Sequence, residues 1–164
     1  MAKLLPYLLN LAGEYRVCSE LNKRGIFATV TYGNRKGVDV YAISDRHERA
    51  LKIEVKTSQR SNFVTSITKK HLANNPNAPD FWVLFQVKPG EGATFDEHFF
   101  ILTHGEICKV QKAQNNKYAK KYLAKYGKKC DFSKGVDNVT IANVQRFSDQ
   151  WDKIKKRLGG SASD

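Results

Sequence analysis

The sequence predicts a single α/β domain in which a mixed β-sheet is flanked by α-helices. Its 164 residues suit one domain of ordinary size. The expected elements run as one helix, three strands, a polar stretch, two more strands and then helices. The segment DFWVLFQV at 80–87 is an almost continuous apolar run, which is typical of a strand covered on both faces. We expect one domain over residues 1–158 and a disordered tail over 159–164.

The first part of the chain indicates a helix followed by an antiparallel meander. The expected helix spans residues 4–24 and ends where Gly25 follows a basic pair, which is a common helix stop. Three segments rich in β-branched and aromatic residues predict strands at 26–33, 38–44 and 50–58. Because only short turn segments separate these strands, we expect them to pair in antiparallel order.

The remainder of the chain predicts a mixture of strands and helices. Apolar residues recur at helical spacing near the end of the chain, which predicts one amphipathic helix there, at Phe147, Trp151, Ile154 and Leu158. The expected elements, in chain order, are a short helix at 68–73, strands at 80–87 and 97–103, a helix at 104–114, a short strand at 138–144 and the amphipathic helix at 145–158.

Charge and cysteine content narrow the class of protein. The net charge is +12 at pH 7, and most of the positive excess lies in residues 107–164. Such a balance favours nucleic acid as a partner, although a basic chain can also be merely soluble. The three cysteines are far apart and form no CxxC or Cys/His cluster, so we expect neither a zinc site nor a disulfide framework. A reducing cytoplasm fits this content, and no apolar run approaches the ~18 residues that span a membrane.

Two carboxylates are expected side by side on neighbouring strands. Asp39 lies in VDVYAIS, a strand that is otherwise apolar or aromatic, although aspartate is depleted in strands. In ALKIEVKTS, Glu54 and Lys56 lie on one face of the strand, and the apolar residues Ile53 and Val55 lie on the other face. If the two strands form a hairpin, Asp39 and Glu54 become neighbours, and two carboxylates repel unless a cation lies between them. Oxygen ligands of this kind suit Mg²⁺ or Mn²⁺.

A third acid comes from the first helix. Glu14 falls on the apolar stripe, and a glutamate that faces a core requires a partner or a metal. Glu20 instead lies beside three basic residues of the same helix, so we expect it to be exposed to solvent. The acids also have ordinary interpretations. Asp39 is then a turn-edge or ion-paired aspartate, Glu54 and Lys56 belong to a cross-strand or solvated pair, and Glu14 is an exposed acid of the first helix.

The order of these motifs resembles the PD-(D/E)XK nuclease superfamily. A helix with GE is followed by GVDV and then by IEVKTS, so that the motif aspartate is Asp39 and the E-x-K triplet begins at Glu54. The first half of the chain is also similar to small Holliday junction resolvase-type nucleases. The resemblance covers residues 11–60 by motif and 80–103 by strand pattern. One departure is Val38, which stands where the motif has a proline.

The resemblance implies a restriction-endonuclease-like fold and a Mg²⁺-dependent endonuclease that hydrolyses phosphodiester bonds of DNA. It implies that Asp39, Glu54 and the carbonyl of Val55 hold Mg²⁺ (or Mn²⁺), with Glu14 helping directly or through water. It also implies that Lys56 orients or helps to deprotonate the attacking water and stabilises the developing negative charge.

Further candidate residues follow from position. Gln59 follows the E-x-K strand closely, and related nucleases often keep a polar residue there. Nucleic-acid-binding candidates are the basic residues next to the motif strands, Arg35, Lys36, Arg60, Lys69 and Lys70. The segment KYAKKYLAKYGKK at 117–129 places tyrosines on one helical face among lysines, which suit phosphate contacts. Its alternative interpretation is tyrosines packed on the core beside a solvated lysine face.

Two other functions stay open from the sequence. The first is a nucleic-acid-binding protein that keeps the nuclease fold without cleaving. The second is a basic interaction module whose strand charges belong to its surface. DNA is the expected partner through the resemblance, RNA is not excluded, and no membrane partner is expected. A homodimer is a further hypothesis, because cutting both strands of a duplex suits two-fold symmetry.

Overall fold

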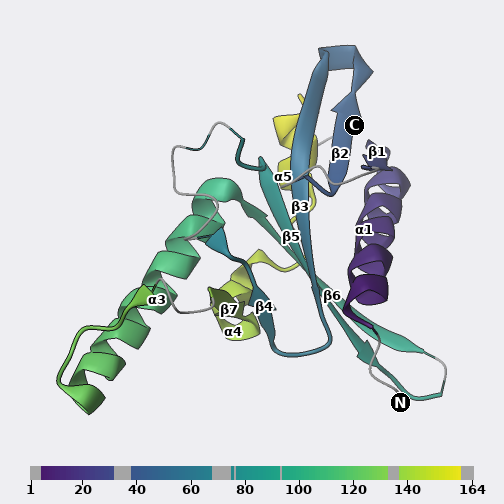
Figure 1. Ribbon diagram of the computed structural model, residues 1–164. Coiled ribbons are helices and arrows are strands. Elements are labelled where there is room, and N and C mark those ends of the chain that lie inside the picture. The colour runs from purple at the N-terminus through teal and green to yellow at the C-terminus, as the bar shows by residue number, and fades with distance from the viewer. Residues whose placement is uncertain are drawn as a thin grey trace.

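The computed structural model describes residues 5–31, 38–67, 75, 77–92, 94–132 and 137–159. Its main feature is a five-stranded mixed sheet with the order β1-β2-β3-β5-β6, beside a two-stranded sheet of β4 and β7 (Figure 1). The strands are β1 (Phe27–Val30), β2 (Val40–Ser44), β3 (Arg49–Ser58), β4 (Asn62–Val64), β5 (Phe81–Pro89), β6 (Phe95–Thr103) and β7 (Asn138–Thr140).

Helices cover both faces of the main sheet. On one face, α1 (Pro6–Lys23) and α5 (Asp152–Arg157) pack on the sheet through a first core that includes Val17 and Trp151. On the other face, α3 (His104–Tyr126), α4 (Ile141–Val144) and the small sheet enclose a second core that includes Ile107 and Val139. No helix within the described ranges is both long and apolar enough to cross a membrane. The predicted fold class, a mixed sheet flanked by helices, is confirmed.

The strand pairings follow the predicted pattern. The first three strands form an antiparallel meander, β3 pairs in parallel with β5, and β5 pairs with β6 in antiparallel order. Residues 81–87 of β5 are all buried, because Val83 points into the first core while Trp82 and Leu84 point into the second. The continuous apolar run therefore predicted correctly a strand covered on both faces.

Several boundaries differ from the predictions. The structure contains β4, which the polar sequence after Ser58 did not predict, and it pairs β4 with β7. The predicted strand at 138–144 ends at Thr140 and continues as α4. The helix predicted for 104–114 continues to Tyr126, so that it absorbs most of the lysine-rich segment. The short helix predicted at 68–73 lies outside the described residues.

Residues 145–158 do not form the single amphipathic helix that their spacing predicts. The chain forms a 3₁₀ helix at Gln145–Phe147 and then the short α5, separated by Asp149 with a positive φ of 52°. The cause is that the apolar side chains belong to opposite faces of the sheet, because Phe147 packs in the second core and Trp151 in the first. The chain passes the edge strand β6 between them, where the N–H of Asp149 donates to a backbone carbonyl at 2.9 Å.

Glu20 is buried, which corrects the prediction that it is exposed. Its carboxylate pairs with Arg16, Lys23 and Arg24 of the same helix, and Arg16 also bonds Glu97 of β6 at 2.7 Å. Burial alone raises the pKa of Glu20, but hydrogen bonds from Arg24, Arg16 and Lys23 outweigh that effect and bring the pKa to about 2. The basic neighbours therefore enclose the acid and join α1 to β6.

The helix α1 lies close to β3 at Gly13. A Cβ at this position would lie 1.8 Å from Oγ1 of Thr57, a distance that no side chain tolerates. Glycine is therefore required for this helix to pack on this strand. The close approach also sets the next residue, Glu14, beside the start of β2.

We predict that Gly13→Ala lowers the free energy of unfolding by about 2 kcal/mol or more, because the new methyl overpacks the contact with Thr57. Urea denaturation measures the change. The matched control is Gly105→Ala in α3, where nothing lies within 4 Å of the new methyl and alanine should be neutral or stabilising. Equal stability of the two variants would show that α1 does not depend on this close approach.

Candidate active site

The candidate site lies where β2 begins and β3 continues past it. The β2–β3 register begins with Val40 opposite Ile53, and the N–H of Asp39 donates to the carbonyl of the same Ile53 at 3.0 Å. Asp39 thus lies just outside the ladder, close enough to Glu54 for the two charges to interact. The N–H of Val55 does not donate to a backbone carbonyl of β2; it donates to Oδ2 of Asp39 at 2.7 Å. The predicted hairpin pairing is therefore confirmed, and an aspartate side chain replaces the next hydrogen bond of the ladder.

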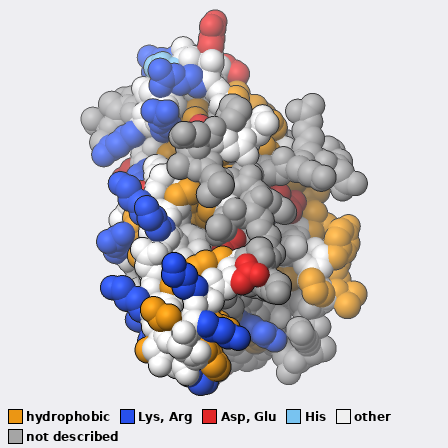
Figure 2. Space-filling model, turned by 60° about the vertical axis from the view of Figure 1, so that its left-hand side comes forward, with side chains coloured by type: hydrophobic (Ala, Val, Ile, Leu, Met, Phe, Trp, Pro, Cys, Tyr) orange, Lys and Arg blue, Asp and Glu red, His pale blue; other side chains and the backbone are white. Residues whose placement is uncertain are grey.

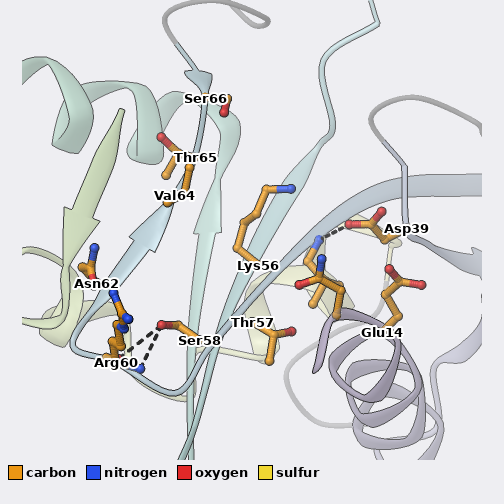
Figure 3. A pocket seen from close by; sticks show the side chains of 12 residues that line it. Glu14, Asp39, Lys56, Thr57, Ser58, Arg60, Asn62, Val64, Thr65 and Ser66 are labelled. Carbon is orange, nitrogen blue, oxygen red and sulfur yellow. Dashed lines mark hydrogen bonds between the residues drawn. The ribbon is translucent and has the colours of Figure 1, made fainter. Parts of the chain in front are cut away.

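A cavity of about 410 Å³ opens at this point (Figure 3). The carboxylates of Glu14 from α1 and Asp39 from the start of β2 lie beside each other on one side of it, and Arg60 and Asn62 lie on the other side. The cavity is lined by Asn10, Glu14, Asp39, Val55, Lys56, Thr57, Ser58, Arg60, Asn62, Val64, Thr65 and Ser66. Its size is that of a ligand site, and most of its lining residues are polar.

The acids repel one another in this arrangement. Burial, and next to it the charge of Glu54, raise the pKa of Asp39 to about 6, although the Val55 N–H and the charge of Lys56 act in the opposite direction. Burial also raises the pKa of Glu14, and the charge of Asp39 adds to this effect. Like charges held close together destabilise the folded chain when no bound partner offsets them. Such an arrangement is typical of functional sites.

Glu54 and Lys56 form an ion pair on one face of β3. Lys56 Nζ contacts Oε1 of Glu54 at 2.5 Å, which partly offsets the burial of the carboxylate. The other oxygen, Oε2, is buried and has no hydrogen-bond partner among the residues that the structure describes. Glu54 is 8% exposed, so the interpretation as a solvated pair is wrong for this residue. Glu54 is not among the residues that line the cavity.

A buried amide holds the turn on the opposite side of the cavity. Gln86 in β5 is 2% exposed, and its Nε2 donates to the carbonyl of Arg60 at 2.8 Å. The N–H of Arg60 donates to Oγ of Ser58 at 3.0 Å. These bonds fix the backbone between β3 and β4, and the exposed Arg60 side chain borders the cavity.

The structure brings together part of the predicted set. Glu14, Asp39, Val55, Lys56 and Arg60 line one cavity. Gln59 follows the end of β3 and does not line it, so its catalytic role stays a prediction. The remaining nucleic-acid-binding candidates, Arg35, Lys36, Lys69 and Lys70, lie outside the described residues.

Sequence reasoning missed several lining residues. Asn10 lies four residues before Glu14 and hence on the same helical face, so the spacing could have identified it. The polar residues of β4 and its flanks, including Asn62, Thr65 and Ser66, could not be found because the strand itself was not predicted.

The oxygen atoms at the site suit a hard divalent cation. A cation between Asp39 and Glu54 would relieve their repulsion and would give the buried Oε2 of Glu54 a partner. Across the described ranges, no group of three or more His, Cys, Asp or Glu side chains lies close enough to hold an ion by itself. Mg²⁺ needs no such cage, because it typically uses one or two carboxylates and keeps several waters. The residues therefore fit Mg²⁺ or Mn²⁺.

Comparison with solved structures found a similar fold. The fold is similar to that of a bacterial homing endonuclease, I-Ssp6803I, with a TM-score of 0.54 over 97% of this chain and 96% of that chain. The chain has a nuclease-like α/β fold. The two sequences are 14% identical, so the likeness concerns the fold alone. No protein-family model matches the chain, and no curated protein matches its sequence.

We predict that Asp39→Asn stabilises the metal-free protein at pH 8, by about 1 to 2 kcal/mol once solvent screening is allowed for. The pKa of Asp39 is raised in the folded state, so the parent loses stability as the pH rises from about 4 to about 6, and the full cost is present above pH 6. The gain should therefore shrink towards pH 4.

Urea denaturation in EDTA at pH 4.5 and pH 8 measures this difference. An Asp39→Asn variant that is less stable than the parent at pH 8, or whose stability difference does not change with pH, would contradict the proposed repulsion at the site.

Proposed function

We propose that the chain is a metal-dependent endonuclease of the PD-(D/E)XK type that hydrolyses phosphodiester bonds of DNA. The observation that carries this proposal is the cavity at the start of β2, which Asp39, Glu14 and Lys56 line together beside the open edge of β3. The similarity of the fold to a protein described as a homing endonuclease supports the reaction class. The basic character of the chain, with a net charge of +12, supports a polyanionic substrate.

In this proposal, Asp39, Glu54 and the carbonyl of Val55 hold Mg²⁺ or Mn²⁺, and Glu14 assists from α1. The carbonyl of Val55 is suited to this role because it points to the same side of β3 as its N–H, which Asp39 binds. When bound, the ion would supply Lewis-acid chemistry, polarising the scissile phosphate and lowering the pKa of water.

Lys56 and Arg60 provide positive charge on either side of the substrate phosphate. Lys56 lines the cavity next to the acids, where its ammonium group would orient the attacking water and stabilise negative charge on the phosphate. Arg60 stands on the opposite wall on a backbone held by Gln86, so that its guanidinium is suited to bind a phosphate oxygen. Neither residue reads bases, and the site itself therefore predicts no sequence preference.

A second candidate function is a nucleic-acid-binding protein that retains the fold without cleaving. One observation favours it. Lys56 already pairs with Glu54, and Glu54 does not line the cavity, so the pair also has a structural role without any ion. A homodimer and a cytoplasmic location stay proposals beside either function.

We predict that the parent cleaves plasmid, single-stranded or branched DNA in Mg²⁺ or Mn²⁺, and that Asp39→Ala and Lys56→Ala each reduce the rate by about a hundredfold or more. Asp39→Ala removes a metal ligand, whereas Lys56→Ala removes charge at the reacting phosphate. Gel assays with each DNA form measure cleavage, and EDTA should abolish it. The matched controls are the exposed residues Asp96 and Lys88, whose alanine variants should cleave like the parent.

Cleavage that survives both site substitutions would refute the assigned site. A parent that binds DNA but cleaves none of these forms under any metal would favour the second candidate function.

A further inference from the structure

The helix α3 extends beyond the body of the protein. Its first turns are anchored in the second core by Ile107 and Val110, and Gln111 is also buried. No residue from 112 to 126 is buried, although the helix continues for ~22 Å over this stretch at 1.5 Å per residue. We call residues 112–129 the arm. Figure 1 shows it projecting from the sheet on the side of β4 and β7.

The arm concentrates positive charge. It contains seven lysines and neither aspartate nor glutamate: Lys112, Lys117, Lys120, Lys121, Lys125, Lys128 and Lys129. Lys117, Lys121 and Lys125 follow one another at four-residue spacing, and like charges at that spacing destabilise a helix. Figure 2 shows Lys and Arg side chains gathered along one side of the face on which α3 comes forward. A helix that is not held by a core and repels itself is suited to an anionic partner.

Aromatic contacts hold the arm in shape. The rings of Tyr118, Tyr122 and Tyr126 contact one another along it in tilted pairs, with centroids 5.9 and 4.6 Å apart. The returning chain adds Phe132, whose ring lies 6.4 Å from that of Tyr118. Tyr118 and Tyr126 stay 55% and 53% exposed, so the alternative in which these tyrosines pack on the core is wrong. The helix ends at Gly127, whose φ of 66° suits the left-handed cap.

A buried polar network joins the base of the arm to the cavity. Thr65 lines the cavity next to β4, and its Oγ1 donates to Oε1 of Gln111 in α3 at 2.7 Å. The amide of Gln111 donates in turn to Asn115 at 2.9 Å and to the backbone carbonyl of Asn138 at 3.3 Å. Thr65 is 1% and Gln111 2% exposed, so this connection is shielded from water and fixes the arm relative to the cavity wall.

We propose that the arm is a second DNA-binding surface, which contacts the phosphate backbone of duplex DNA flanking the segment that lies in the cavity. This inference rests on the proposed function, because it assumes that DNA enters the cavity beside β4. The lysines of the arm would then add affinity to that of the cavity without reading sequence.

The test is binding of a 30-base-pair duplex in EDTA, where cleavage does not interfere, measured by fluorescence anisotropy at several salt concentrations. The arm variant carries Lys117→Gln, Lys121→Gln and Lys125→Gln. The control variant removes three charges elsewhere, through Lys88→Gln, Lys156→Gln and Arg157→Gln on β5 and α5. Glutamine keeps helix propensity, and circular dichroism should show an unchanged helix content and an equal or higher Tm for the arm variant.

We expect the arm variant to bind the duplex about tenfold or more weakly at 150 mM salt, and its plot of log K against log salt to be less steep by about 2 to 3. The control should lose much less. Equal losses in the two variants, or binding by the arm variant like that of the parent, would overturn the proposal. A loss confined to RNA of the same length would overturn it as well.

Cleavage assays separate this proposal from the nuclease assignment. If the parent cleaves DNA while the arm variant binds like the parent, the proposal for the arm is refuted and the nuclease assignment is supported. If the arm variant alone loses duplex affinity while the parent never cleaves, the arm stands and the nuclease fails.

Discussion

The hydrogen bond from the Val55 N–H to the Asp39 carboxylate is the interaction on which the site depends. At this point β2 has not yet begun, and β3 continues without it, so a side chain takes the place of a backbone acceptor. An aspartate side chain is short enough to accept this bond from the backbone of the neighbouring strand. Because a side chain and not a strand pairs with β3 here, the edge of β3 is open to a cavity. The same side chain holds a negative charge beside Glu54.

The rest of the fold encloses that open edge from two sides. The helix α1 approaches closely because Gly13 has no side chain, and it delivers Glu14 to Asp39. The strand β4 and its flanks form the other wall, and Gln86 holds the turn that leads to it. The acids are thus forced together by packing that is favourable elsewhere. Local conflict inside an otherwise consistent structure is a common property of functional sites.

Sequence periodicity predicted those parts of the fold whose side chains alternate in one regular element. The meander and the neighbourhood of Asp39 and Glu54 follow from alternation of residues in strands, and β5 follows from its continuous apolar run. The strand β4 was not predicted because it has only three residues within a mostly polar stretch and pairs with β7, about 75 positions later in the chain. The amphipathic spacing of Phe147 and Trp151 misled because the chain changes faces of the sheet between them. Two of the cations around the buried Glu20 also contact distant residues. Arg16 pairs with Glu97, and Arg24 lies over the ring of Trp151. No local sequence pattern reveals these contacts.

The central claim is that Asp39, Glu54 and the Val55 carbonyl form a metal site at the open edge of β3. The most direct measurement is anomalous X-ray diffraction from crystals of the protein grown with Mn²⁺, recorded near the manganese absorption edge. We predict a single strong anomalous peak in the cavity, within coordination distance of the Asp39 carboxylate and the Val55 carbonyl. A cavity without a peak at saturating Mn²⁺, or a peak held only by other residues, would contradict the account.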